Sequence, residues 1–141
     1  HWEAYCSGTN IPRYARALYR EDDGDVETAL PVEDDDFSAI DVFEHAGEDA
    51  FADRVIERLC HWNAMGVANV IHAYAPIIVY IGGAVALNNP DRIVEPIRER
   101  LDEMVMVNVP DVQLTDHGDD VVVKGALASA MTGGTGDRAR L

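Results

Sequence analysis

Two adjacent glycines near the middle of the chain are the residues whose type and spacing first indicate chemistry. Gly82 and Gly83 follow the apolar run Ile77–Ile81. Glycine has no Cβ atom, so the backbone at such a pair can turn sharply or can come close to a bound ligand. The pair therefore predicts either a plain strand-to-helix turn or a ligand-binding turn, and the local sequence is compatible with both.

Other side chains that could bind a metal ion do not form a recognisable motif. His61, His72 and His117 are scattered along the chain, which favours structural roles. Two acidic runs, residues 21–25 and 33–36, could suggest Ca²⁺ binding. Neither run has the ligand spacing and the closing glutamate of an EF-hand loop, so both are predicted to be solvated loops.

Length and charge narrow the class of protein. The 141 residues suit one domain, and the net charge of −15 argues against direct binding to nucleic acids or to anionic membranes. No apolar run is long enough to span a membrane, and the N-terminal sequence lacks the pattern of a signal peptide. We therefore expect a soluble protein of the cytoplasm, without nucleic-acid or membrane partners.

The rarer residues also bear on the compartment. Cys6 and Cys60 are far apart and follow no pattern, which predicts reduced thiols and no disulfide bond. Lys124 is the only lysine in this strongly acidic chain. This composition suggests a halophilic protein, because molar salt would screen the repulsion between the acidic groups.

The first half of the chain is predicted to be helical, because its apolar residues recur at intervals of three and four. We expect one helix over residues 2–20, broken near 8–10, and a short helix after the N-cap Ser38. An acidic insert of about residues 21–36 separates them. The longest helix is expected over residues 48–73, where Gly66 predicts the close approach of another backbone.

The second half is predicted to alternate strands and helices, which gives a helix-rich α/β fold with few strands. The expected strands are a buried one at 77–81 and a second at 112–115. A helix capped by Asn89 lies between them, and a last helix begins near Asp120. Because a helix joins the strands, they should be parallel. Two strands make a poor sheet, so we expect a further strand from a second subunit or from upstream residues.

Four blocks give the chain a family resemblance. It resembles the C-terminal part of ROK-family sugar kinases in the order HWEAYCSGTNIPRYAR, NAMGVANVIHAYAPIIVYIGGAV, NPDRIVEPIRERL and LTDHGDDVVVKGALASA. The resemblance implies part of the C-terminal lobe of an actin-like, ribonuclease-H-like fold. Residues 1–132 would form this lobe fragment, and residues 133–141 would be a flexible tail.

The resemblance also implies site residues. Glu3 matches the last glutamate of the family's zinc motif, which binds sugar hydroxyls. His1 falls on the motif's third cysteine and is the candidate zinc ligand. Gly82, Gly83 and Ala84 match the glycine turn on the nucleotide side of the cleft, with Ala84 in place of the last glycine. Asp120 matches the residue that begins the last helix, where we expect a capping or helix-dipole role.

The implied function of the intact protein is that of a glucokinase-like enzyme, which transfers the γ-phosphate of ATP to the 6-hydroxyl of a hexose. Its cofactors would be ATP with Mg²⁺, with a structural Zn²⁺ ion at His1, and a homodimer is expected. The family's catalytic aspartate and phosphate loop have no counterpart in this sequence, so the chain alone should be inactive. Two alternatives stay open: a fragment of a sugar-sensing ROK repressor, and a non-catalytic dimerising domain.

Overall fold

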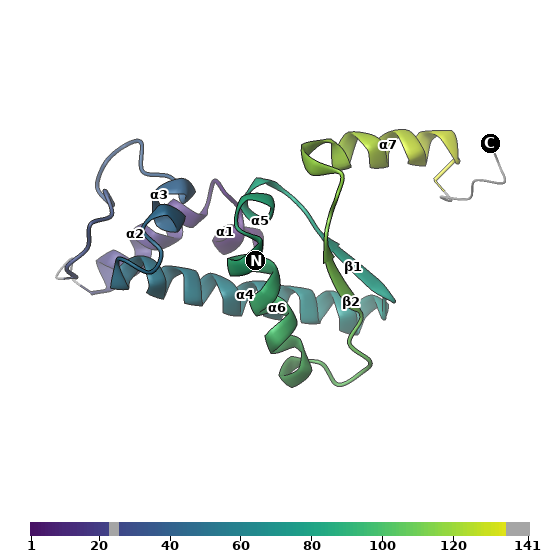
Figure 1. Ribbon diagram of the computed structural model, residues 1–141, viewed down its shortest axis with the longest axis horizontal. Coiled ribbons are helices and arrows are strands. Elements are labelled where there is room, and N and C mark those ends of the chain that lie inside the picture. Colours follow the sequence, from purple (N-terminus) through teal and green to yellow (C-terminus); the bar gives the residue numbers. More distant parts are fainter. Residues whose placement is uncertain (23–25, 135–141) are drawn as a thin grey trace.

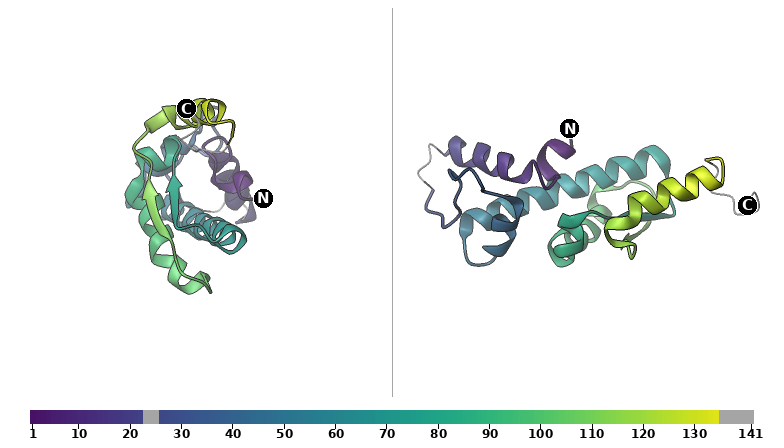
Figure 2. Two further views of the ribbon diagram at one scale, coloured as in Figure 1. Left: turned by 90° about the vertical axis from the view of Figure 1, so that its right-hand side faces the viewer. Right: turned by 90° about the horizontal axis from the view of Figure 1, so that it is seen from above.

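One long helix organises the molecule. In the computed structural model, which describes residues 1–22 and 26–134, helix α4 (Ala50–Tyr74) runs along the body of the protein (Figure 1). The helices that precede it lie mainly along its N-terminal half, and the two strands that follow it lie beside its C-terminal part (Figures 1 and 2). Both hydrophobic cores include residues of α4, with Phe51, Val55 and Leu59 in one and Val67 and Ile71 in the other.

The N-terminal helices agree with the expected pattern. Helices α1 (Glu3–Cys6) and α2 (Ile11–Glu21) are separated by a break at residues 7–10, and a proline lies in the first turn of α2. Helix α3 (Ala39–Glu44) follows Ser38, whose backbone N–H donates to the Asp41 carboxylate at 2.8 Å. This bond is one half of a capping box, so the predicted helix start is confirmed.

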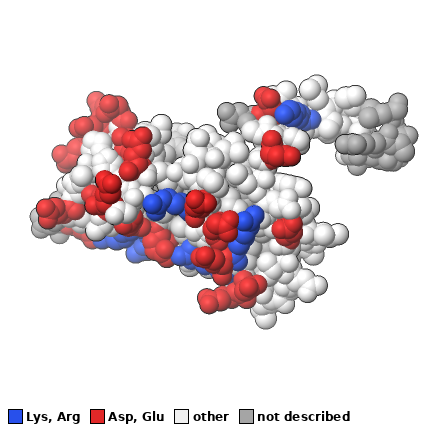
Figure 3. Space-filling model, in the orientation of Figure 1, with Lys and Arg blue, Asp and Glu red and all other residues white. Residues whose placement is uncertain are grey.

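The acidic insert is more ordered than a solvated loop. Its residues 33–36 are exposed as expected, and acidic side chains gather at this end of the molecule (Figure 3). Leu30, Val32 and Phe37, however, are buried in the core beside α2 and α4. The Arg16 side chain fixes the loop by donating to the carbonyl of Val32 at 2.9 Å. Residues 23–25 of the insert lie outside the described residues.

The sheet consists, within the described residues, of two parallel strands. Strands β1 (Ile78–Ile81) and β2 (Asp111–Leu114) pair with Ile78 opposite Asp111, and helix α6 (Pro90–Met104) connects and packs against them. The expected parallel pairing is confirmed, but the expectation of a buried β1 is wrong. Ile78 is 38% exposed and Tyr80 is 59% exposed, because α6 covers only one face of this narrow sheet.

A short helix that the sequence did not predict follows β1. Helix α5 (Ala84–Asn88) precedes α6, and the Asn89 side chain donates back to the carbonyl of Val85 at 3.0 Å. Asn89 makes no side-chain capping bond to α6. The expectation that Asn89 caps the later helix is therefore corrected: its amide closes α5, while Pro90 begins α6.

The last helix stands apart from the body (Figure 1). A 3₁₀ turn, η1 (Gly118–Asp120), leads into α7 (Val121–Met131), which has no buried residue. Asp120 makes no side-chain capping bond, although its carboxylate lies 3.8 Å from the Lys124 ammonium group. Residues 135–141 of the expected tail lie outside the described residues. Among the helices that the structure describes, none is both long and apolar enough to cross a membrane.

Candidate functional site

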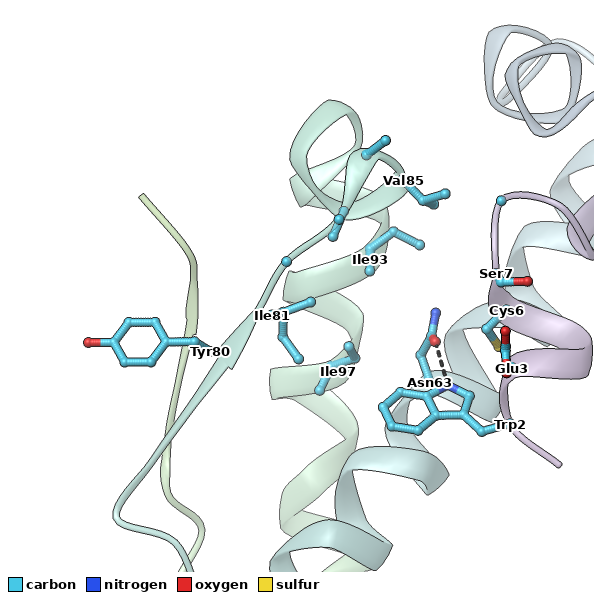
Figure 4. Close-up of a pocket in the computed structure, with 15 residues that line it drawn as sticks. Trp2, Glu3, Cys6, Ser7, Asn63, Tyr80, Ile81, Val85, Ile93 and Ile97 are labelled. Carbon is cyan, nitrogen blue, oxygen red and sulfur yellow. Dashed lines mark hydrogen bonds between the residues drawn. The ribbon is translucent and has the colours of Figure 1, made fainter. Parts of the chain in front are cut away.

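An open cavity of about 540 Å³ lies beside α4 and is lined by residues of α1, α6 and the turn between β1 and α5 (Figure 4). Its lining includes Glu3 together with Gly82, Gly83 and Ala84. The fold therefore brings together two groups of candidate residues that lie about eighty positions apart in the sequence. His1, the fifth candidate, is not among the residues that line this cavity.

Trp2 fixes one side of α1 on the long helix. Its indole N–H donates to the side-chain oxygen of Asn63 at 2.9 Å. The indole ring also lies against Gly66, where an added Cβ would meet ring carbons at 2.4 to 2.7 Å. The close approach that Gly66 predicts is therefore real, but its partner is an aromatic side chain and not another backbone.

Aromatic contacts fix the other side of α1. The Tyr5 ring stacks on Trp62 of α4 with centroids 5.5 Å apart, and the Trp62 indole N–H donates to the hydroxyl of Tyr14 at 3.1 Å. Asn10 adds a bond from its amide to the backbone carbonyl of Glu3 at 3.2 Å. These contacts hold α1 in place although none of its four residues is buried. They support packing roles for both tyrosines.

Glu3 is thus an exposed carboxylate on a well-fastened helix turn. It lies in the cavity wall between the contacts of Trp2 and those of Tyr5. Among the hydrogen bonds and ion pairs of the described residues, none involves the Glu3 carboxylate. A carboxylate oxygen accepts hydrogen bonds only, so this group is available to hydroxyl or amino groups of a ligand.

Glycine is needed at the two positions of the turn for different structural reasons. Gly82 lies next to Thr115, and an added Cβ would meet the Thr115 methyl carbon at 3.0 Å. Gly83 has φ of 96°, a region that residues with a Cβ rarely adopt. Apart from Gly83 itself and its two chain neighbours, no described residue has an atom within 4 Å of the position of a Cβ on Gly83. The turn itself therefore requires glycine, and it also leaves open space beside the backbone.

A second cavity of about 590 Å³ borders the short helix α5. Gly8, Ala84 and Val85 line both cavities, while the second is completed largely by residues of α3. The start of α5 thus lines two cavities, each large enough for part of a small ligand. No local pattern in the sequence indicates the second cavity, because it depends on how α3 packs near α5.

The described residues do not provide a metal site. No group of three or more histidine, cysteine, aspartate or glutamate side chains among them could hold an ion, so His1 belongs to no such group there. The thiols are also poor ligands and nucleophiles. Burial raises the pKa of Cys6 to about 11, and burial also raises the pKa of Cys60.

Sequence reasoning missed two residues of the first cavity, Trp2 and Asn63. Trp2 directly precedes the candidate Glu3, and its contacts with Asn63 and Gly66 leave no local pattern in the sequence. Asn63 is only 7% exposed on the apolar side of α4. One signal could have indicated it: Asn63 and Gly66 are three residues apart, so they share a helix face, and a polar residue is uncommon on such a face.

Comparisons of the sequence with known proteins identify the family of this chain. The sequence model described as "ROK family" matches residues 1–132. The chain is 32% identical over 133 residues to a glucokinase of Pyrobaculum calidifontis, covering 92% of this chain and 40% of that protein. It is 38% identical over 136 residues to a glucokinase of Aeropyrum pernix, covering 92% of this chain and 42% of that protein. The chain thus spans about two-fifths of the length of these relatives.

Solved structures show the same fold. The ROK-family glucokinase of Streptomyces griseus, in complex with glucose and AMPPNP, matches with a TM-score of 0.70 at 21% identity, over 89% of this chain and 42% of that one. The ROK hexokinase of Thermus thermophilus matches with a TM-score of 0.67 at 22% identity, over 89% and 38%. The expected fold class, part of an actin-like sugar-kinase fold, is confirmed.

Proposed function

The chain belongs to the ROK family, and on this premise we propose that the whole protein is an ATP-dependent glucose kinase that phosphorylates the 6-hydroxyl of the sugar. One observation carries the proposal: a single cavity is lined by the carboxylate of Glu3 and by the glycine turn at Gly82–Ala84. Similarity to two proteins named glucokinase supports the choice of reaction. The cytoplasm is the compartment that suits this activity.

The two parts of the cavity wall have different tasks in this proposal. Glu3 orients the sugar by accepting hydrogen bonds from its hydroxyl groups, which are stronger when the acceptor is charged. Gly82, Gly83 and Ala84 let the nucleotide come close to the backbone, because no side chain occupies the space beside Gly83. Phosphoryl transfer depends mainly on such positioning and on neutralising phosphate charge, which Mg²⁺ bound with ATP supplies.

The catalytic base and the phosphate loop are not assigned to any residue of this chain. We therefore propose that the 141-residue chain alone phosphorylates no sugar. The zinc ion implied at His1 takes no part in the mechanism, because the described residues offer no complete ligand set for it. Measurable turnover of glucose and ATP by the isolated chain would contradict this division of tasks.

The proposed function is tested with the full-length protein in a coupled assay for glucose-dependent ADP formation. Glu3→Gln should raise the KM for glucose by on the order of 10- to 100-fold, since it removes a charged acceptor. The KM for ATP should stay within about twofold. Glu33→Gln, in the exposed acidic loop, is the matched control and should leave both constants unchanged. Absence of hexose phosphorylation by the wild-type protein would refute the proposal.

We also propose that the protein forms a homodimer through the exposed sheet. Support comes from the uncovered apolar side chains of β1, Ile78 and Tyr80, since an apolar strand at the edge of a sheet readily accepts a partner. Sedimentation at several protein concentrations tests the proposal. The wild-type protein should sediment as a dimer, and Tyr80→Lys should shift it towards the monomer. A monomer at every concentration would contradict the proposal.

A further inference from the structure

The side-chain amide of Asn63 is a buried polar group in the wall of the first cavity. Asn63 belongs to α4 and is only 7% exposed, among apolar neighbours such as Ile93 and Ile97. Buried amides in proteins are nearly always hydrogen-bonded through both their oxygen and their nitrogen. The partners of this amide therefore indicate what the cavity is built to bind.

The orientation of the amide follows from its contact with Trp2. The indole N–H of Trp2 can only donate a hydrogen bond, so the group that faces it at 2.9 Å must be the Asn63 oxygen. The Asn63 nitrogen then points the other way, into the cavity (Figure 4). Gly66 makes this position of the indole possible, because the ring occupies the space that a side chain at residue 66 would fill.

The amide nitrogen is left with two donor hydrogens and no acceptor. Among the described residues, the Asn63 side chain makes only the bond from Trp2, and no buried side-chain nitrogen or oxygen is sealed off without a partner. The nitrogen is therefore reachable from the cavity. The Asn63 nitrogen is fixed in direction, faces the cavity and has no hydrogen-bond acceptor among the described residues. These are the properties expected of a group that binds a ligand.

We propose that Asn63 donates a hydrogen bond to the ligand in this cavity and acts together with Glu3. A hydroxyl group both donates and accepts, and both residues line the cavity, so the hydroxyl groups of one ligand can donate to the Glu3 carboxylate and accept from the Asn63 amide. Such a donor–acceptor pair suits a polyhydroxylated ligand. This inference rests on the proposed function, in which that ligand is a hexose, and it makes Asn63 a second sugar-contacting residue.

The test exchanges only the group that faces the ligand. In the full-length protein, Asn63→Asp keeps an oxygen for the indole of Trp2 but replaces the amide nitrogen by a second acceptor. Asn69→Asp is the matched control, because Asn69 is exposed on the same helix. Asn63→Asp should raise the KM for glucose by on the order of 10-fold or more and leave the KM for ATP close to that of Asn69→Asp. Because the new carboxylate is buried and lowers the Tm, both variants are assayed at a temperature at which circular dichroism shows them folded. The inference would be overturned if the KM values for ATP and glucose rose equally in Asn63→Asp, or if its KM for glucose equalled that of Asn69→Asp.

Deoxyglucose analogues separate a direct contact from an indirect one. The wild-type protein should lose affinity for the analogue that lacks the contacted hydroxyl, while Asn63→Asp should discriminate less between this analogue and glucose than the wild-type protein does. Additive losses for every analogue would refute direct contact. Calorimetric titration with glucose keeps the two proposals apart. If the wild-type protein binds glucose without phosphorylating it, the kinase proposal fails, and weaker binding by Asn63→Asp than by Asn69→Asp still supports the role of Asn63. Equal binding by both variants overturns it.

Discussion

Asp49 is expected to be one of the most important polar residues for stability. It is buried at the N-terminus of α4, and one carboxylate oxygen accepts from the backbone N–H groups of Phe51 and Ala52, both at 2.8 Å. The other oxygen accepts from the N–H of Ala29 at 2.6 Å and from the hydroxyl of Thr28 at 2.9 Å. One side chain thus caps the long helix and fastens the acidic insert to it.

Asp49→Asn isolates the second of these tasks. The amide oxygen can still cap α4, since asparagine is as good an N-cap as aspartate. The amide nitrogen, however, is a donor, so it would face the N–H of Ala29, and the Thr28 hydroxyl could no longer donate to this position. Hydrogen bonds to a charged group contribute about 1.5–3 kcal/mol each, and two are lost, so we expect a free energy of unfolding lower by about 3 kcal/mol at neutral pH.

The effect should depend on pH in a defined direction. Burial disfavours the ionised carboxylate, but its hydrogen bonds to Ala52, Ala29, Thr28 and Phe51 outweigh burial, and the pKa of Asp49 is lowered. As the pH falls, the unfolded state therefore takes up this proton first. The stabilisation is fully present above the unfolded pKa of about 4 and is lost as the pH falls through the lower pKa of the folded state.

Urea unfolding at a series of pH values, followed by circular dichroism, measures both expectations. The difference between the wild-type protein and Asp49→Asn should be constant from pH 7 to about pH 5 and should shrink below about pH 4. Glu48→Gln is the matched control, because it removes one charge at the neighbouring, exposed position. A variant as stable as this control at pH 7, or a difference that stays constant down to pH 3, would refute the reasoning.

Three further predictions follow from particular contacts. Gly66→Ala should lower the Tm, because the new methyl group displaces the Trp2 ring. Gly125→Ala is the control: apart from its chain neighbours and the backbone of its own helix, no described residue lies within 4 Å of its new methyl group, so it should raise the free energy of unfolding by up to about 1 kcal/mol. Equal changes in the Tm of both variants would contradict the contact between Gly66 and Trp2. Alkylation of Cys6 at pH 8, followed by mass spectrometry, should be on the order of 100-fold slower than for a free thiol, given its pKa of about 11. The Tm should rise from low to molar KCl because salt screens the net charge of −15, and an unchanged Tm would count against a halophilic protein.

Much of the fold could be predicted because its signals are local. The spacing of apolar residues along α4 and α6 is repeated over several turns, and Ser38 and Pro90 begin helices where such residues usually do. Asn89 shows the limit of this reasoning. Asparagine before proline favours an N-cap, but the short helix α5 ends at the preceding residue, and the amide bonds to its carbonyl at Val85. Local preference could not choose between two adjacent helix ends.

The candidate site was only partly predictable, because its contacts join distant segments. The family resemblance indicated Glu3 and the glycine turn from their place in known motifs. It gave no role to Trp2, whose partners Asn63 and Gly66 lie about sixty residues away. A hydrogen bond between such distant positions depends on how α1 packs against α4, and a single sequence carries no direct record of that packing.

The prediction that β1 is buried is wrong for this chain, but the apolar sequence of β1 still says something about the surroundings of the strand. Its sequence is apolar on both faces, as is typical of a strand in the interior of a larger sheet. Helix α7 behaves likewise, with Val122 at 76% exposed and no buried residue, although a helix that is apolar on all sides is normally buried. Both elements lie in a chain that spans about two-fifths of its relatives' length. Their composition therefore fits an assembly with more covering structure, and amide exchange along β1 should be slower in the full-length protein than in the isolated chain.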